Sequence, residues 1–319
     1  MKALASPASL KGVLTAVEAA SYLARGFREA GAEAEELPVA DGGEGTLDVL
    51  ARALSGDWHT ATVSDPLLRP VEARWLLLAD ARAVVESAEA IGLGRLSEEE
   101  RDPLRASSRG LGELISAALE AGPRELLVGL GGSATVDGGA GLREVVADLP
   151  VPTTVACDVR NPLLGPSGAA RAFGPQKGAA PAVVKTLEAR LAAMPELTAV
   201  AGLPGAGSAG GLGAALAALG AELVAGAELV LDVVGFRHRL QDADLVVTGE
   251  GTVDRWSAEG GKAPAAVAAA CRKAGVSCIV FGGRVLQRIE GAESIELSGD
   301  PARAAEDLVE LGRALGARA

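Results

Sequence analysis

The chain has 319 residues and a formal net charge of −12, from 30 basic and 42 acidic side chains. Hydrophobic residues make up 49% and charged residues 23%, which is typical of a globular protein large enough for two domains. The acidic balance argues against nucleic acid and anionic membranes as main partners. Three cysteines without a CxxC pair, and two histidines far apart in sequence, indicate neither a disulfide framework nor a zinc site.

The expected strands and helices alternate along the chain. The opening stretch MKALASPASLKG has no apolar signal core, so secretion is not indicated, and the three cysteines without a CxxC pair favour a reduced, cytoplasmic protein. Apolar runs typical of buried strands recur at 2–6, 74–79, 125–130, 153–159, 243–250 and 277–283. Ala- and Leu-rich stretches that indicate helices lie at 16–30, 109–121, 182–193 and 262–274. This order predicts an α/β protein with a largely parallel sheet.

Two regions differ from this pattern. Residues 58–96 contain successive short strand-like runs with turns at Asp65-Pro66 and Arg69-Pro70, which predicts a second domain with a mixed sheet. Residues 197–221 form a long uncharged run whose length would suffice to span a membrane. Its glycines and Pro204 instead favour a loop followed by a buried helix.

Glycine-rich loops that carry carboxylates follow several of the expected strands. The clearest is VGLGGSATVDGGAGL at 128–142, and similar segments place carboxylates at Asp41 and Glu44, at Asp158, and at Glu250 and Asp254. For a single loop, an aspartate that caps a helix and a glycine that closes a turn are a sufficient explanation. Several such loops at the carboxyl ends of strands suit a polyphosphate with its Mg²⁺.

Familiar phosphate motifs do not decide the matter. The sequence has no GxxxxGK[ST], and its GxGxxG match at 205–210 follows a proline rather than a clear strand. Three lysines are flanked by glycine, namely Lys11, Lys177 and Lys262. A lysine on such a loop can reach a phosphate, although a solvated surface lysine is the simpler interpretation.

Five motifs in order resemble the bacterial type-1 glycerate kinase family: PVADGGEGTLDVL, VGLGGSATVDGGAGL, VACDVRNPLLGPSGAARAFGPQKGA, PGAGSAGGLGAAL and DLVVTGEGTVD…GKAP. The resemblance covers about residues 7–270. It implies an ATP- and Mg²⁺-dependent kinase that phosphorylates D-glycerate, with 2-phosphoglycerate favoured as product. It also implies a flavodoxin-like parallel-sheet domain, expected at 1–60, 105–147 and 242–319. A second α/β domain of mixed sheet, restriction-endonuclease-like, would interrupt it at 61–104 and 148–241.

The resemblance also implies roles for particular residues. It implies catalytic roles for Asp158, Asp41 and Lys262, with Asp158 the first choice for a base and Asp41 the second. Asp137 would either cap the following helix or reach the metal. Substrate and phosphate would be bound by Lys11, Glu44, Gly131, Gly132, Ser133, Thr135, Lys177, Gly207 and Ser208. The metal ligands would be Asp137, Glu250 and Asp254.

The sequence departs from the family motifs at four loop positions. Ala8 replaces an acidic residue, Val136 an Asn, Thr252 a basic residue and Trp256 a Gln. Two other functions therefore stay open beside a glycerate kinase: a kinase for another small hydroxy acid, and a paralogue that binds nucleotide or sugar acid without turnover. We expect a monomer or homodimer that binds neither nucleic acid nor a membrane.

Overall fold

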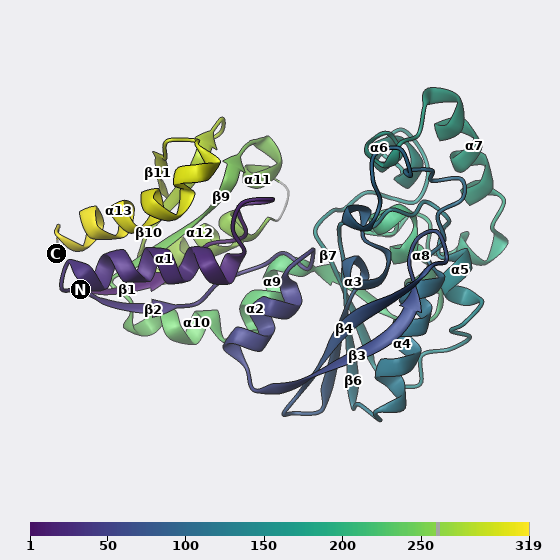
Figure 1. Cartoon of the computed structure of the whole chain (residues 1–319), viewed down its shortest axis with the longest axis horizontal. Helices are drawn as coiled ribbons and strands as arrows, with labels where there is room; N and C mark the ends of the chain where they lie inside the picture. Colours follow the sequence, from purple (N-terminus) through teal and green to yellow (C-terminus); the bar gives the residue numbers. More distant parts are fainter. Residues whose placement is uncertain (260–261, 319) are drawn as a thin grey trace. The chain divides into compact units, whose positions relative to one another are not determined.

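A computed structural model describes residues 1–259 and 262–318 of the chain. The chain divides into two compact units (Figure 1). Unit 1 comprises Met1–Asp41, Asp48–Ala53 and Ala227–Ala319. Unit 2 comprises Gly42–Leu47 and Leu54–Gly226. An α/β domain with a parallel sheet, interrupted by a second domain with a mixed sheet, is therefore confirmed.

Unit 1 contains a five-stranded, all-parallel sheet. Its strands, in spatial order, are β11 (Glu293–Glu296), β10 (Ser277–Val285), β9 (Leu245–Val253), β1 (Lys2–Ala5) and β2 (Glu33–Glu36). Numbered by their order within the unit, the strands run 2-1-3-4-5, which is the flavodoxin-like order. In this order the direction in which successive strands are added to the sheet reverses between β1 and β9. Ligands of such sheets bind at that point, beyond the carboxyl ends of the strands.

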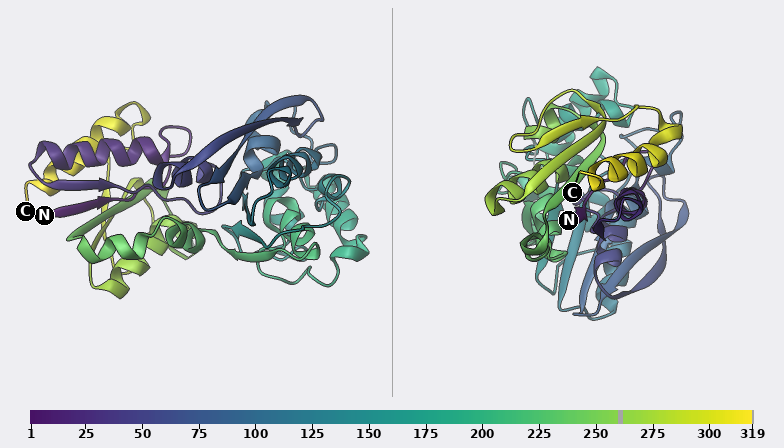
Figure 2. Two further views of the ribbon diagram at one scale, coloured as in Figure 1. Left: turned by 90° about the horizontal axis from the view of Figure 1, so that it is seen from below. Right: turned by 90° about the vertical axis from the view of Figure 1, so that its left-hand side faces the viewer.

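Helices cover both faces of this sheet. They are α1 (Ala16–Glu29), α10 (Phe236–Arg239), α11 (Arg255–Glu259), α12 (Ala263–Ala274) and α13 (Ala304–Gly316). Helices α1 and α13 cover one face, seen above the sheet in the left view of Figure 2. They pack closely because Gly26 and Gly312 have no side chains: a Cβ on Gly26 would lie 2.1 Å from the Val309 carbonyl oxygen. On the opposite face, Cys271 of α12 contacts Cys278 of β10.

Unit 2 is built on a six-stranded mixed sheet. Its strands, in spatial and chain order, are β3 (Gly56–Ser64), β4 (Pro70–Leu78), β5 (Arg82–Glu86), β6 (Glu125–Leu130), β7 (Thr153–Cys157) and β8 (Glu222–Ala225). The first three strands pair antiparallel and the last four pair parallel. The mixed sheet expected around 58–96 is therefore confirmed. Asp65 forms the expected turn, since its Oδ1 accepts hydrogen bonds from the amides of Leu67 and Arg69.

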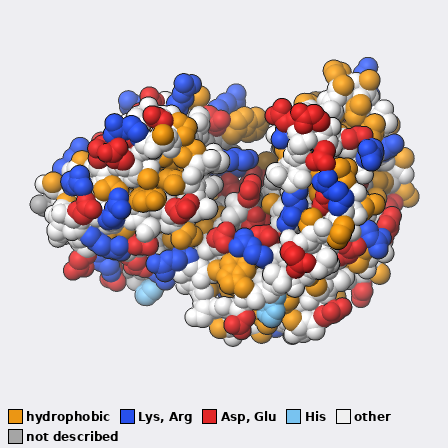
Figure 3. Space-filling model, viewed as in Figure 1, with side chains coloured by type: hydrophobic (Ala, Val, Ile, Leu, Met, Phe, Trp, Pro, Cys, Tyr) orange, Lys and Arg blue, Asp and Glu red, His pale blue; other side chains and the backbone are white. Residues whose placement is uncertain are grey.

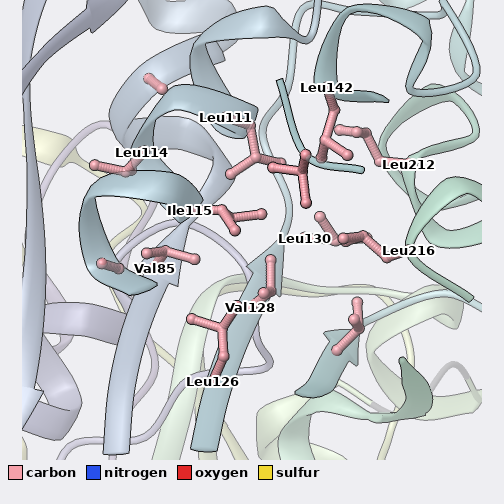
Figure 4. Close-up of a cluster of buried hydrophobic side chains, with 14 of the residues drawn as sticks. Val85, Leu111, Leu114, Ile115, Leu126, Val128, Leu130, Leu142, Leu212 and Leu216 are labelled. Carbon is pink, nitrogen blue, oxygen red and sulfur yellow. The ribbon is translucent and has the colours of Figure 1, made fainter. Parts of the chain in front are cut away.

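The main core of unit 2 lies between its sheet and α4. The helices here are α3 (Ser87–Ile91), α4 (Arg109–Glu120), α5 (Ala140–Arg143), α6 (Ala169–Phe173), α7 (Pro181–Ala192) and α8 (Leu212–Ala218). Leu111, Leu114 and Ile115 of α4 pack with apolar side chains of β6 (Figure 4). A second buried cluster joins α6, α7 and α8. The remaining two helices, α2 (Thr46–Ala53) and α9 (Gly226–Val233), each contain a boundary between the units.

The observed units differ from the domain limits expected from sequence. Residues 105–147, expected in the flavodoxin-like domain, lie in unit 2 because β6 pairs with β5 and β7. Residues 227–241, expected in the second domain, lie in unit 1. An apolar strand such as β6 is buried on both faces and fits either parallel sheet, so its sequence does not identify its neighbours.

The long uncharged run forms a loop and a helix, as its glycines predict. Helix α8 is short, and Leu212, Ala214, Ala215 and Leu216 are fully buried in it. Among the helices of the described residues, none combines the length and the hydropathy needed to cross a membrane.

Candidate functional site

Five of the expected site residues lie in unit 1, at or beyond the carboxyl ends of strands. Lys11 lies in the loop after β1, and Asp41 lies on the segment after β2. Glu250 is near the end of β9, Asp254 directly follows it, and Lys262 directly precedes α12. Lys262 Nζ lies 3.0 Å from Asp41 Oδ2, although the two residues are 221 positions apart. The fold of unit 1 therefore brings a lysine and a carboxylate together where such sheets bind ligands.

Glu250 is a half-buried carboxyl of this group. Its Oε1 is buried and has no hydrogen-bond partner among the described residues. Burial raises the pKa of Glu250, and the nearby charges of Asp41 and Asp254 raise it further, whereas a hydrogen bond from Ser257 and the charge of Lys262 act in the opposite direction. A buried, unsatisfied carboxylate oxygen is costly, so a bound cation or hydrogen-bond donor at this atom would stabilise it.

Asp254 has a visible structural role at the start of α11. Its Oδ1 accepts hydrogen bonds from the backbone amides of Trp256 and Ser257 and from the Ser257 hydroxyl. Trp256 itself is 71% exposed, and Thr252 is exposed on β9. Ala8 extends the pairing of β1 with β9, since its amide donates to the Gly249 carbonyl. Gly261 of the GKAP motif lies outside the described residues.

In unit 2 two glycine loops pack backbone against backbone. A Cβ on Gly131 would lie 2.5 Å from Gly43 Cα, and one on Gly129 would lie 2.7 Å from the Gly42 carbonyl oxygen. Gly42 itself has φ +87°, and a Cβ there would lie 2.6 Å from Ala156 Cβ. These distances are shorter than side chains permit, so this packing requires glycine. The glycines of GGEG and GLGGS therefore allow the loops to touch.

The third glycine loop, at 205–211, packs in the same way. A Cβ on Gly207 would lie 2.3 Å from the Pro162 carbonyl oxygen, and one on Gly210 would lie 2.0 Å from the Thr135 carbonyl oxygen. Ser208 is buried next to these glycines. The expected binding residues Gly207 and Ser208 thus lie on a loop that is in backbone contact with the loop of Thr135.

Lys177 is buried against the glycine loop at 129–135 and does not lie on the surface. Its side chain is buried, and its Nζ donates to Ser133 Oγ at 3.0 Å and to the Thr135 carbonyl oxygen at 2.8 Å. Burial lowers the pKa of Lys177 to about 7, although the nearby charge of Asp137 acts in the opposite direction. Lys177 therefore holds the loop that carries Ser133 and Thr135.

Both carboxylate oxygens of Asp137, expected either to cap the following helix or to reach the metal, accept hydrogen bonds within unit 2. Its Oδ2 accepts hydrogen bonds from the amide and the hydroxyl of Ser108 at 2.8 Å, and from the Gly141 amide at 3.2 Å. Its Oδ1 accepts from the Gly139 amide at 3.1 Å. Two of these four bonds involve the turn at the start of α5 and two involve Ser108, which directly precedes α4, so the carboxylate joins these two segments.

The other two expected site carboxylates of unit 2 are Glu44 and Asp158. Glu44 is exposed, and its Oε2 would lie 3.5 Å from a Cβ built on Gly132, so its carboxylate is close to that exposed glycine. Asp158 is half-buried and directly follows β7. Its neighbour Cys157 is buried, and burial raises the pKa of this thiol to about 11, as for an inert core cysteine.

Sequence reasoning missed Glu86 and Ser87, at the carboxyl end of β5. Both are buried, and both hydrogen-bond to the glycine loops described above. A signal was present in the sequence: Glu86 is a carboxylate at the end of an apolar run, like the expected site carboxylates. Unlike most of them, it has no glycine next to it in the sequence. Over residues 1–259 and 262–318, no three His, Cys, Asp or Glu side chains are close enough to hold a metal ion between them.

Comparison with known proteins decides the family. The sequence model described as the glycerate kinase family matches residues 3–147 and 145–300. The chain belongs to the glycerate kinase family. Members of this family are kinases, so the chain is a phosphotransferase that uses an alcohol group as acceptor.

Named relatives agree with this family. The chain is 40% identical over 315 residues to the glycerate 2-kinase of Escherichia coli K12, covering 86% of this chain and 82% of the relative. It is 40% identical over 327 residues to the glycerate kinase of Bacillus subtilis 168, covering 89% and 85%. A crystal structure of a Salmonella typhimurium LT2 protein provisionally assigned as glycerate kinase 2 matches with a TM-score of 0.84 and 35% identity, covering 100% of this chain and 98% of that one.

Proposed function

We propose that this chain transfers the γ-phosphoryl group of ATP to a hydroxyl of D-glycerate and that 2-phosphoglycerate is the product. The family and the names of its relatives support glycerate as acceptor, and the name of the Escherichia coli relative supports the 2-hydroxyl. The structural observation that carries the proposal is the pairing of Lys262 with Asp41 at the ligand-binding edge of the parallel sheet.

Phosphoryl transfer needs positioning and charge neutralisation more than covalent chemistry. Lys262 precedes the first turn of α12, so its ammonium group and the backbone amides of that turn, other than Pro264, would bind phosphate oxygens. Lys11, exposed on the loop after β1, would add a second positive charge. Asp41 would orient Lys262 through their ion pair.

Asp158 remains our proposed base. It is a half-buried carboxylate at the carboxyl end of β7, in the position where α/β sheets place functional side chains. It would accept the proton of the attacking hydroxyl, as an aspartate does in many kinases. Asp41, our second candidate, forms an ion pair with Lys262.

The residues present fit a magnesium ion in part. Mg²⁺ bound with ATP supplies positive charge that neutralises the phosphate oxygens. Glu250 suits this ion because its Oε1 is buried and has no partner among the described residues. Asp254 would contribute through Oδ2, since its Oδ1 caps α11. Asp137 does not fit, because four hydrogen bonds already involve its two oxygens.

The loops of unit 2 would bind the remaining polar groups. Gly131 and Gly132 would present bare backbone, and Glu44 would face the same space as Gly132. Ser133, Thr135 and Lys177 are buried, so we propose that Lys177 supports this loop and does not touch the substrate.

A coupled assay for ADP release tests the proposal over a panel of small hydroxy acids. We expect ATP-dependent turnover to be highest with D-glycerate, and product analysis by phosphorus NMR to identify the 2-phosphate. A higher kcat/KM with a different hydroxy acid would replace the acceptor. ATP binding in calorimetry without turnover on any acceptor would replace the kinase by a non-catalytic paralogue.

A further inference from the structure

Glu86 and Ser87 are adjacent buried residues that hydrogen-bond to the two touching glycine loops. Glu86 is the last residue of β5 and is 3% exposed, and Ser87 is the first residue of α3 and is fully buried. Burial of polar groups this complete is favourable only when their hydrogen bonds are satisfied. Their partners therefore explain why they are there.

Glu86 binds the first loop. Its Oε1 accepts a hydrogen bond from the Gly45 amide at 2.9 Å, and its Oε2 accepts one from the Leu47 amide at 3.2 Å. These amides flank the start of α2, and the exposed carboxylate of Glu44 is the next residue before Gly45. One buried carboxyl thus fixes the backbone that carries Glu44.

Ser87 binds the second loop. Its Oγ donates to the Gly131 carbonyl oxygen at 2.9 Å and accepts from the Gly131 amide at 3.2 Å. Both backbone groups of one glycine are therefore held by one hydroxyl. Gly131 directly precedes Gly132 and Ser133, and a Cβ on Gly131 would lie only 2.5 Å from Gly43 Cα of the first loop.

We propose that Glu86 and Ser87 act as one positioning element, which sets the place of Glu44 relative to Gly132 and Ser133 and thereby the binding of the hydroxy acid. Because the two residues are consecutive and buried, a shift of either moves both loops. The pair makes no contact with substrate in this scheme and acts through the loops. The proposal rests on the proposed kinase function.

The cost of burying Glu86 supports a specific role. Burial raises the pKa of Glu86 to about 8, and the neighbouring carboxylates of Glu89 and Glu44 raise it too, whereas the Leu47 and Gly45 amides act in the opposite direction. A carboxyl placed here disfavours its own ionisation. A glutamate at this position is explained by its two oxygens, which accept hydrogen bonds from two backbone amides at once.

The experiment compares Glu86→Gln and Ser87→Ala with two matched controls in unit 2. Glu113→Gln changes a part-buried glutamate that accepts from the Ser64 amide, and Thr153→Val removes a hydroxyl that donates to the Val151 carbonyl oxygen. No hydrogen bond in the described structure joins either control to a glycine loop. For each protein we would measure kcat and KM for D-glycerate and for ATP, and amide hydrogen exchange by mass spectrometry.

We expect each test variant to lose about 10- to 100-fold in kcat/KM for glycerate, the scale set by a small misplacement of a binding group. Exchange should accelerate at 43–47 in Glu86→Gln and at 130–133 in Ser87→Ala, and the controls should change neither. If the residues act as one element, the double variant loses less than the product of the two single losses. Losses no larger than in the controls, or losses that multiply, would overturn the proposal.

Failure of the proposed function gives a different result. If the wild type does not turn over glycerate, kcat/KM is lost as a readout, but hydrogen exchange still reports on the two loops. Unchanged exchange at 43–47 and 130–133 in both variants would then reject the positioning element by itself. Accelerated exchange in a protein that does not turn over glycerate would retain the element and reject D-glycerate as the acceptor.

Discussion

At the scale of single residues, Lys177 shows how burial gives a side chain a pH-dependent effect on stability. Burial lowers its pKa from the ordinary 10.5 to about 7. Between these values the unfolded chain binds more protons at this site than the folded chain does, so the contribution of Lys177 to stability rises with pH through that window. Below about pH 7 the site must bury a charged ammonium group, which donates to Ser133 Oγ and the Thr135 carbonyl oxygen.

Lys177→Met tests this sign. The variant cannot titrate, so the free energy of unfolding of the wild type should rise relative to that of the variant as the pH increases from about 7 to about 9, when both are measured by urea unfolding. Lys185→Met, on the surface helix α7, is the control and should show no such trend. A difference between wild type and Lys177→Met that is the same at both pH values would contradict the lowered pKa.

Asp158 gives the second prediction at this scale. Asp158→Asn removes the proton acceptor and keeps the shape of the side chain, so kcat should fall by about 10²-fold or more, the scale for a positioned base. The melting temperature should change little. Asp148→Asn, at an exposed position of the same unit, is the control and should retain kcat. If Asp158→Asn is folded and turns over at nearly the wild-type rate, Asp158 is not the base.

At the scale of elements, four long helices and the apolar strands could be predicted from sequence, whereas the long helix α13 and the edge strands β2 and β11 were missed. Helices α1, α4, α7 and α12 begin and end within about two residues of their expected limits, because their apolar positions recur with the helical period over several turns. A capping box of Thr15 and Glu18 marks the start of α1. Strands β2 and β11, with the sequences EAEE and ESIE, are short edge strands of the sheet in unit 1. Nothing in their composition indicates a strand.

The site was predictable to a similar degree. Strand ends located the carboxylates, but a carboxylate that caps a helix and one that faces a ligand have the same local sequence, as Asp137 shows. Lys177 next to a glycine suggested an exposed lysine, yet its side chain is buried. Contacts between distant segments decide both cases. The pairing of Lys262 with Asp41 likewise depends on the order of the strands and not on any motif.

The glycine loops give the prediction at this scale. Gly131→Ala would place a Cβ 2.5 Å from Gly43 Cα, so one loop must shift. We expect the free energy of unfolding to fall by roughly 1–3 kcal/mol, the usual cost of overpacking. Gly94→Ala is the matched control, since a Cβ there has no neighbour within 4 Å and its φ is not positive. Urea unfolding measures both, and an equal effect in the two variants would show that the loops are not tightly packed.

At the scale of the whole molecule, charge is the dominant feature. The net charge is −12, yet Figure 3 shows Lys and Arg side chains interspersed with Asp and Glu over the face in view. An anionic hydroxy acid and a polyphosphate are repelled by the average field of such a protein. Local cations would therefore be needed at the proposed site, and Lys11 and Lys262 would supply only part of the charge that balances a triphosphate.

This charge balance leads to the prediction on the metal. ADP formation from ATP and glycerate should stop when EDTA removes divalent cations, and it should return with Mg²⁺. In Glu250→Gln the half-saturating Mg²⁺ concentration should rise by about 10-fold, the effect of about 1.4 kcal/mol on binding. Much of kcat should return at saturating Mg²⁺, because the ion is held chiefly by the phosphates. Full activity in EDTA would exclude a metal requirement. An unchanged half-saturating Mg²⁺ concentration in Glu250→Gln would show that the ion does not bind at Glu250 Oε1, which has no partner among the described residues.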